Sequence, residues 1–358
     1  MSLIKVKGRG AENLGRRNLV INGAMQIWQR GTSIDTIASN GFLCDRWRIP
    51  HSGTDGNVDI DRTTDVPDGK GFGFSQKVSM DASESSLDAG DQIRIVQRIE
   101  GQNLQSLKKG TSSAESITIS FYVKSSVAAA YTVNIRDEDN DRDNAKTYTI
   151  NSANTWEFKS ITFPGDTTGA LDNDNGRSFD LNFWIDAGTN FTSGTFYNGT
   201  WAAGDNTKKV SATTGWLQSS SPTWFITGVQ METGTTATDF EHRSFFEELQ
   251  LCKRYFQNIG QDGTNFAGFN YNGLPMFTCH WPVEMRATPT ASVQGTGSAY
   301  SSTNATGQTN YTGSTTSNLN IYTKSNRNYL TGGSWSGTGN DRGNALLGNQ
   351  NVNFDAEL

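Results

Sequence analysis

The chain has 358 residues, a formal net charge of −6, and only 34% hydrophobic and 18% charged residues, with 38 glycines. This composition excludes a helical bundle or a long coiled coil, which need many Ala, Leu, Glu and Lys residues, and the acidic balance argues against general nucleic-acid binding. Aromatic residues reach 11%, and disordered chains lack them, so the sequence predicts an all-β protein with many turns.

Cysteine spacing and hydropathy narrow the class further. Cys44, Cys252 and Cys279 are odd in number and far apart, so we expect no disulfide framework and no cysteine-ligated metal site. No sequence motif points to a cofactor, and we expect none. The first residues lack the apolar core of a signal peptide, and no window approaches about 18 consecutive apolar residues. We therefore expect no membrane span and a soluble protein that is made in the cytoplasm.

Residues 1–17 are predicted to form a basic arm outside the folded domains. Its basic side chains oppose the single acidic Glu12 and are Lys5, Lys7, Arg9, Arg16 and Arg17. A short arm interrupted by glycines cannot bury a core, so it is either a frayed terminus or a peptide that orders on an acidic partner surface. In the second case these five residues are the anchoring candidates.

Residues 18–240 carry the pattern of many short strands. Ile117, Ile119, Phe121 and Val123 alternate with polar or amphipathic residues, which is the period of two expected when one face of a strand meets a core. Residues 179–185 repeat the alternation, and turn-rich stretches separate these runs. Without long intervening helices, the spacing predicts a jelly-roll β-sandwich and excludes a parallel α/β sheet.

A helix and a polar C-terminal domain are predicted to follow. Phe245, Leu249, Cys252 and Phe256 form one helical stripe, so we assign residues 241–258 to a helix and linker. Residues 259–358 read as a smaller C-terminal β domain with polar strands and long loops. One such chain buries too little apolar surface to be stable alone, so we expect a homotrimer.

Catalytic signatures are weak. The sequence has no HExxH, no GxSxG and no P-loop, so we expect no enzyme, with a glycan hydrolase as a minority hypothesis. The acid-rich segments 136–144 and 172–176 are either calcium sites or solvated hairpin tips. His242 is interpreted as a helix cap or a surface residue.

Aromatic side chains support a better hypothesis. Tryptophan and tyrosine rings stack on the apolar C–H faces of sugars, while polar neighbours hydrogen-bond the hydroxyls. The glycan-binding candidates lie in the C-terminal domain and are Tyr300, Tyr311, Tyr322, Tyr329 and Trp335. The alternative for each of these residues is packing at an intersubunit contact. Four other tryptophans lie in apolar strand-like contexts and are assigned to the core: Trp28, Trp47, Trp156 and Trp224.

Several strings resemble a known family. They are NLVINGAMQIWQRG at 18–31, DRW at 45–47, GVQMETG at 228–234, ATDFEHR at 237–243, EEL at 247–249 and CKRYF at 252–256. They are similar to bacteriophage tail fibre and minor tail structural proteins. The resemblance implies a jelly roll like that of carbohydrate-binding modules, homotrimeric assembly and location in the virion tail. The basic arm would then dock to a tail adaptor or nozzle protein, and the polar domain 259–358 would lie distally and face the receptor. The resemblance implies no catalytic residues.

Three functions remain open at this point. The chain is a tail fibre that binds host-surface glycan during attachment, a tailspike-type depolymerase that cleaves such glycan, or a purely architectural tail protein without a receptor. The lack of a long repetitive β-helix region argues against the depolymerase. The first hypothesis fits the aromatic and polar composition best.

Overall fold

In the computed structural model the chain is mostly β-structure and divides into two compact units, Met1–Glu248 with Leu358, and Leu249–Glu357. The structure describes residues 17–53, 55–259, 266–271, 274–279, 282–294, 299–304, 307–312, 319–324, 327–332, 344–348 and 351–358. Each unit is considered separately below.

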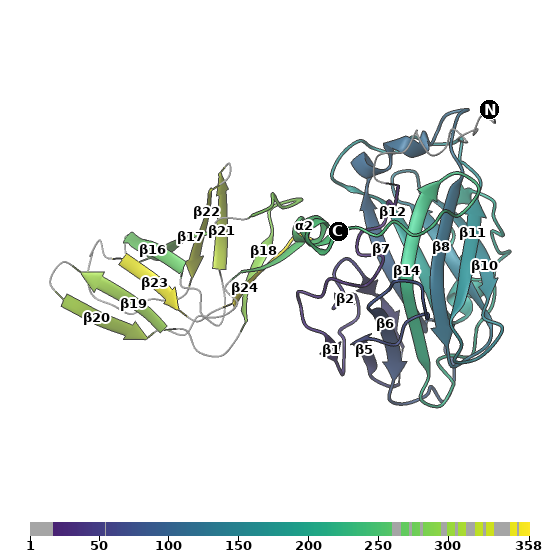
Figure 1. The fold of residues 1–358 in the computed structure, drawn as a ribbon, viewed down its shortest axis with the longest axis horizontal. Helices are drawn as coiled ribbons and strands as arrows, with labels where there is room; N and C mark the ends of the chain where they lie inside the picture. The colour runs from purple at the N-terminus through teal and green to yellow at the C-terminus, as the bar shows by residue number, and fades with distance from the viewer. Residues whose placement is uncertain are drawn as a thin grey trace, which may run out of the picture. The chain divides into compact units, whose positions relative to one another are not determined.

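Two antiparallel sheets form the first unit (Figure 1). The six-stranded sheet has the order β1 (Ser33–Ile34), β5 (Val58–Thr63), β6 (Ser75–Met80), β14 (Thr223–Thr233), β8 (Ile117–Ser125) and β11 (Glu157–Phe163). The eight-stranded sheet has the order β13 (Ala202–Ala203), β10 (Arg142–Thr149), β9 (Ala130–Asp137), β12 (Arg177–Ala187), β7 (Gln92–Glu100), β3 (Arg48–Ile49) and β2 (Gly41–Phe42), and β4 (His51–Ser52) also pairs with β7. The chain crosses repeatedly between the sheets, as a jelly roll does.

The core lies between the two sheets because each strand alternates its side chains. Ile119 and Phe121 of β8 point inward and join one continuous cluster with Phe183 of β12. The rings of Phe121 and Phe183 meet edge to face with centroids 5.0 Å apart, a favourable aromatic geometry. The predicted all-β class and the jelly-roll sandwich are therefore confirmed.

Short helices fill the connections of this unit. They are α1 (Thr189–Thr192), η2 (Gly101–Asn103), η3 (Gln105–Leu107) and η4 (Asn206–Lys208). Phe191 of α1 packs against Trp184, whose ring is 5.1 Å away and almost fully buried. This contact places α1 against strand β12 of the eight-stranded sheet.

Hydrogen bonds connect the segment 18–31 to other parts of the first unit. The Asn22 amide donates to the carbonyls of Ile27 and Asp45 at 2.9 and 3.0 Å and accepts from the backbone N–H of Ile27 at 3.0 Å. Asn22 itself has φ +57°, a conformation that asparagine tolerates better than most residues. Arg243 donates to the Val20 carbonyl at 3.1 Å, so the two ends of the sandwich segment are fastened together.

One helix longer than a single turn is found in the described part of the chain. α2 spans Phe245–Lys253, shorter than the predicted helix and linker, because the chain enters strand β15 (Phe256–Ile259) three residues later. Cys252 and Phe256 are buried as the stripe predicts, whereas Phe245 is 60% exposed. The stripe is therefore buried at its C-terminal end and exposed at its first position in the single chain.

The second unit contains two sheets. A three-stranded sheet has the order β15, β24 (Asn351–Asp355) and β18 (Thr290–Gln294). A seven-stranded sheet has the order β20 (Gly307–Thr312), β19 (Ala299–Asn304), β23 (Asn344–Gly348), β16 (Phe266–Tyr271), β17 (Leu274–Cys279), β22 (Arg327–Gly332) and β21 (Leu319–Lys324). The expected C-terminal β structure is present, despite the polar sequence.

Candidate functional site

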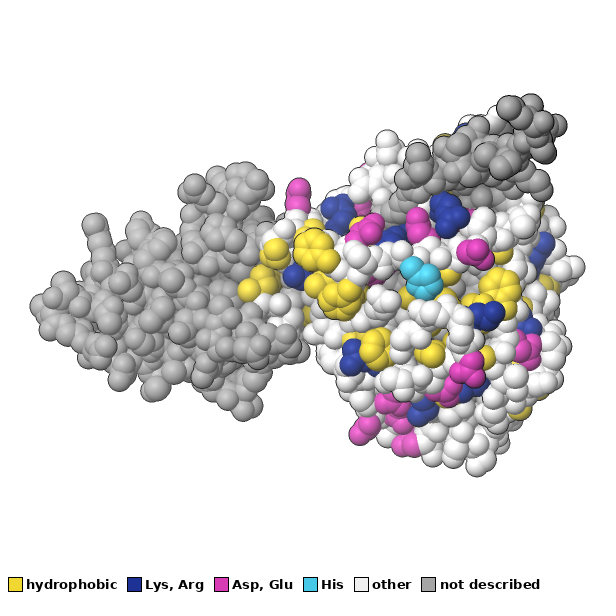
Figure 2. All heavy atoms as spheres, viewed as in Figure 1, with side chains coloured by type: hydrophobic (Ala, Val, Ile, Leu, Met, Phe, Trp, Pro, Cys, Tyr) yellow, Lys and Arg dark blue, Asp and Glu magenta, His cyan; other side chains and the backbone are white. Residues whose placement is uncertain are grey.

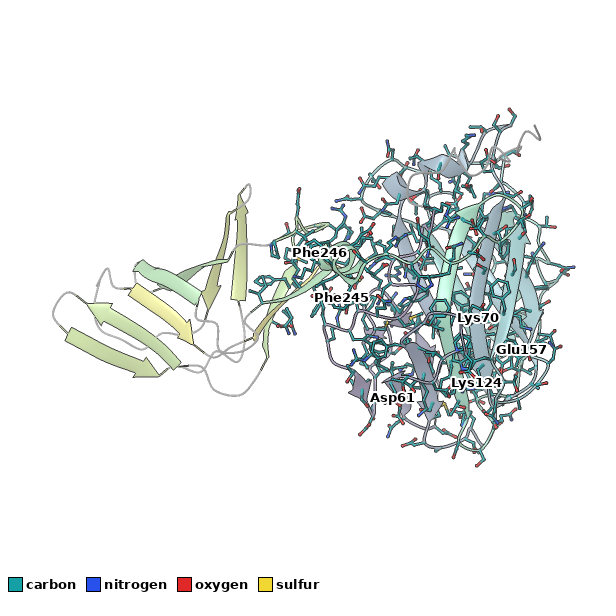
Figure 3. All side chains as sticks on the ribbon, in the orientation of Figure 1. Asp61, Lys70, Lys124, Glu157, Phe245 and Phe246 are labelled. Carbon is teal, nitrogen blue, oxygen red and sulfur yellow. The ribbon has the colours of Figure 1, made fainter. Side chains whose placement is uncertain are left out.

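The outer face of the six-stranded sheet carries an aromatic groove. In β8 the inward residues Ile119 and Phe121 alternate with Ser120 and Tyr122, which therefore face away from the core. Tyr122 pairs in register with Phe158 of β11, and Phe158 is 51% exposed. Figure 3 places Lys70, Lys124 and Glu157 over the same strands, β14, β8 and β11.

Five rings from separate segments meet there. Phe72 lies at the centre, with ring centroids 5.6 Å from Tyr122, 5.1 Å from Phe240 and 5.3 Å from His242. Tyr122 contacts Phe158 at 5.1 Å. We define the aromatic groove as these five residues. Figure 2 shows hydrophobic and basic side chains side by side on this face of the sandwich.

A glycine lets the central ring settle on the sheet. β14 has an irregular register between Thr227 and Gln230, and Gly228 within it has φ +64°. A Cβ atom at Gly228 would lie 2.6 Å from Cζ of Phe72, far inside van der Waals contact. The bulge and its glycine therefore create the space in which Phe72 lies against the strand.

The groove has a volume of about 450 Å³, and polar groups line it beside the rings. Those with no hydrogen bond or ion pair to another described residue are the side chains of Lys70, Ser120, Tyr122, Asp239 and His242. They offer ammonium, hydroxyl, imidazole and carboxylate groups beside open ring surfaces. Apolar walls with a few convergent polar groups are typical of small-molecule sites.

A charged belt borders the groove. Lys124 forms an ion pair with Asp65 and lies 4.3 Å from the ring centroid of Phe225. The indole N–H of Trp156 donates to Asp65 at 2.9 Å. Although burial opposes it, hydrogen bonds from Lys124 and Trp156 lower the pKa of Asp65, so its carboxylate stays ionised. Trp156 lies on this outer face and outside the core cluster, so its assignment to the core is wrong, whereas the other three tryptophans are in the core as predicted.

The tyrosines proposed from the sequence form two cross-strand pairs. Tyr300 of β19 is opposite Tyr311 of β20, and Tyr322 of β21 is opposite Tyr329 of β22. These strand pairs form the two opposite edges of the seven-stranded sheet. Trp335 lies outside the described residues. The pairs remain candidate glycan contacts that the backbone alone does not test.

The basic arm is described only at its last residue. Arg17 donates its backbone N–H to the Glu241 carboxylate at 3.1 Å, and its guanidinium donates to the Asp239 carbonyl at 3.4 Å. Arg17 is thus held by the sandwich. Lys5, Lys7, Arg9 and Arg16 lie outside the described residues, and their anchoring role stays a prediction.

The acid-rich segments are tied to basic groups. Asp143 pairs with Arg136 at 2.8 Å, and Asp137 pairs with Lys109 at 2.5 Å. Both carboxylates are fully buried, so the reading of segment 136–144 as a solvated tip fails for these two acids. Within the described ranges, no group of three His, Cys, Asp or Glu side chains is placed to hold a metal ion.

Comparisons with known proteins give distant likenesses. No protein-family model matches the chain, and no curated protein matches it. Among solved structures, the enzymatically active domain of tailspike protein 4 of bacteriophage CBA120 is 17% identical with a TM-score of 0.31, covering 60% of this chain and 21% of that one. The family 11 carbohydrate-binding module of the cellulase Lic26A-Cel5E of Clostridium thermocellum is 16% identical with a TM-score of 0.27, covering 58% and 100%.

A third structure, TmCBM61 in complex with β-1,4-galactotriose, is 8% identical with a TM-score of 0.31, covering 61% of this chain and 99% of that one. At such TM-scores no functional conclusion follows from the likeness. In the described part of the chain, no helix has both the length and the apolar character needed to cross a bilayer.

The sequence reasoning missed the groove. Its rings come from a loop, two strands and the segment before α2, and no spacing in the sequence connects them. Tyr122 carried a usable signal, because it is a large ring at an outward position of a strand whose inward positions are all apolar. Phe158, between Glu157 and Lys159, carried a second.

Proposed function

We propose that this chain is a structural component of a phage tail fibre and that its jelly-roll domain binds a host-surface glycan in the aromatic groove. The observation that carries the glycan proposal is the groove itself, in which exposed rings adjoin uncommitted polar groups. Sugar rings present C–H faces that suit Phe158 and Tyr122, and hydroxyls that suit Lys70, Asp239 and His242. Such amphipathic surfaces are how aromatic sites bind partly polar ligands.

The tail location is supported by the strings at 18–31 and 228–256, which resemble phage tail fibre proteins. The same resemblance supports a homotrimer and docking to a tail adaptor or nozzle protein through residues 1–17. Mass spectrometry of purified virions tests the location, and absence of the chain from the particles would contradict it.

We propose that binding occurs without turnover. Asp239 is the single carboxylate among the residues that line the groove, whereas glycoside hydrolysis commonly uses two carboxyl groups on either side of the bond. Incubation with host surface polysaccharide should release no oligosaccharide. Release by the purified chain would favour the depolymerase.

A glycan array followed by calorimetry tests the groove. We expect Phe158→Ala to weaken binding of the selected oligosaccharide about tenfold, because a lost aromatic contact is worth about 1.4 kcal/mol. Phe246→Ala is the matched control, since Phe246 is 70% exposed on α2 and outside the groove. Equal binding by Phe158→Ala and the unchanged chain would contradict the site.

A further inference from the structure

The outer face of the other sheet carries a row of arginines. Arg94 and Arg98 lie on β7 at positions that alternate with the core residues Ile93, Ile95 and Ile99. They pair in register with Trp184 and Asp180 of β12. Both therefore face away from the core, on the sheet opposite the aromatic groove.

Two more arginines extend the row. Arg48 of β3 is opposite Val96, the residue midway between Arg94 and Arg98. Arg177 of β12 is opposite Glu100, one step beyond Arg98. We define the arginine row as Arg48, Arg94, Arg98 and Arg177. At about 3.3 Å per strand residue, Arg94 and Arg98 lie roughly 13 Å apart along β7, with Arg48 on the neighbouring strand β3 and Arg177 on the neighbouring strand β12.

The four guanidinium groups of the row outnumber the carboxylates beside them, which are those of Asp180, Glu138 and Glu100, the residue opposite Arg177. Arg177 takes most of the available acid, because its Nε is 2.7 Å from Asp180 and its Nη2 pairs with both Asp180 and Glu138. Arg98 Nε is 3.7 Å from Asp180, and its Nη1 donates a hydrogen bond to the main-chain oxygen of Leu358. Arg48 and Arg94 have no ion pair with any residue that the structure describes.

Burial and the neighbouring arginines lower the pKa of three members of the row. Burial lowers the pKa of Arg94 and of Arg98 to about 10, with Asp180 opposing the shift and neighbouring arginines adding to it. Burial also lowers the pKa of Arg48. All remain charged at neutral pH, so an added anion would offset the repulsion among them.

Two Nε donors of the row lack a partner, whereas Arg48 Nε donates to the Asn40 carbonyl at 3.3 Å. The Nε atoms of Arg94 and Arg98 are buried without a hydrogen-bond partner, which is uncommon in folded proteins. The Arg94 guanidinium lies 4.5 Å from the ring centroid of Trp184. Contact between a guanidinium and an aromatic face leaves its in-plane N–H groups available to an oxyanion.

We infer that the arginine row is a second binding surface, one that takes the carboxylates of an acidic polysaccharide. This inference rests on the proposed glycan-binding function and names a ligand class for a different face of the domain. Four cations spread over three neighbouring strands suit a polymer with repeated charges better than one small anion. Arg forks bind carboxylates with two parallel hydrogen bonds.

Calorimetry on the full chain tests the inference, with polygalacturonate as the probe and its fully methyl-esterified form as the uncharged counterpart. We expect the acidic polymer to bind at least tenfold more tightly than the ester, and the difference to shrink when salt is raised, because salt screens exposed charge pairs. Equal binding of the two polymers would overturn the inference.

Variants locate the site. Arg48→Gln with Arg94→Gln should weaken polygalacturonate binding at least tenfold, while circular dichroism confirms that the variant is folded. Lys108→Gln is the matched control, because Lys108 is 54% exposed and pairs with Glu115 away from the row. An unchanged affinity of the double variant would overturn the assignment.

Competitors identify the ligand class. Inorganic phosphate or monomeric galacturonate competing as well as the polymer would overturn the row as a polymer site, and tighter binding of double-stranded DNA would overturn the polysaccharide. The effect of Phe158→Ala on binding of a neutral glycan tests the aromatic groove and does not involve the arginine row. The groove and the arginine row can therefore fail independently.

Discussion

Gly228 decides whether the groove can form. Gly228→Ala would place a methyl group where the Phe72 ring lies and would force φ +64° on a residue with a Cβ. We expect a loss of about 1–3 kcal/mol in unfolding free energy from crowding and backbone strain, together with weaker glycan binding. Urea unfolding and calorimetry on the same variant measure both, and retention of wild-type values would contradict this role.

Lys109 acts as a buried structural cation. Its Nζ lies 2.5 Å from Asp137 and 3.1 Å from Asp166, and it donates to the carbonyls of Thr168 and Gly169 at 2.7 and 2.8 Å. Lys109→Met leaves two buried carboxylates without this partner. We expect a loss of about 3–5 kcal/mol, as for other broken buried ion pairs, measured by urea unfolding.

The neighbouring Lys108→Met is the control for that experiment. Lys108 pairs with Glu115 at 2.8 Å on the surface, where an ion pair contributes about 0–1 kcal/mol. A similar loss of unfolding free energy in both variants would contradict a larger contribution from the buried ion pairs of Lys109.

Glu157 fastens the loop between β10 and β11 at neutral pH. It accepts from Lys159 at 2.6 Å and from the backbone N–H groups of Asn151 and Ser152 at 2.8 and 2.9 Å. Burial opposes ionisation, yet these hydrogen bonds lower the pKa of Glu157 to about 2. Because an unfolded glutamate titrates at about pH 4.3, the stabilisation is complete above that pH and is lost as pH falls through 2.

The check is the stability difference between the unchanged chain and Glu157→Gln as a function of pH. We expect the difference to be constant above about pH 4.3 and to shrink as pH falls toward 2. A difference that does not change across that interval would contradict the role of the carboxylate.

At the scale of elements, strands with strict alternation of apolar and polar residues could be predicted from the sequence. Features that depend on contacts between distant segments could not. β8 follows directly from Ile117, Ile119, Phe121 and Val123, since those side chains can be buried on one face only. Trp156 was misassigned because its apolar neighbours suggested burial, whereas its indole N–H bonds Asp65 on the outer face. The helix ended early because β15 competes for the following residues.

The two candidate surfaces show the same division. Tyr122 and Arg94 occupy outward strand positions that alternation alone indicates. Their partners Phe72 and Trp184 come from distant segments, and tertiary packing brings them together. The residues that strands contribute to a site can therefore be predicted from the sequence. The residues that loops and distant segments contribute can be identified only in the structure.

At the scale of the whole molecule, the two proposed surfaces lie on opposite sheets of one sandwich. Such an arrangement would let one domain contact a neutral and an acidic part of a glycan coat. If the chain is a trimer, three copies of each surface raise avidity without new contacts.

The trimer is itself a prediction of the sequence reasoning. Light scattering coupled to size exclusion should give a mass three times 39.1 kDa, because the polar C-terminal strands bury too little surface in one chain. A mass of 39.1 kDa that persists at high protein concentration would contradict it.

The central claim is that the aromatic groove is the glycan site. A crystal structure of the full chain with the oligosaccharide selected on the array tests it most directly. We predict a sugar ring stacked on Phe158 and Tyr122, with hydroxyls bonded to Lys70 or Asp239. A sugar bound elsewhere, with the groove holding solvent, would contradict the claim.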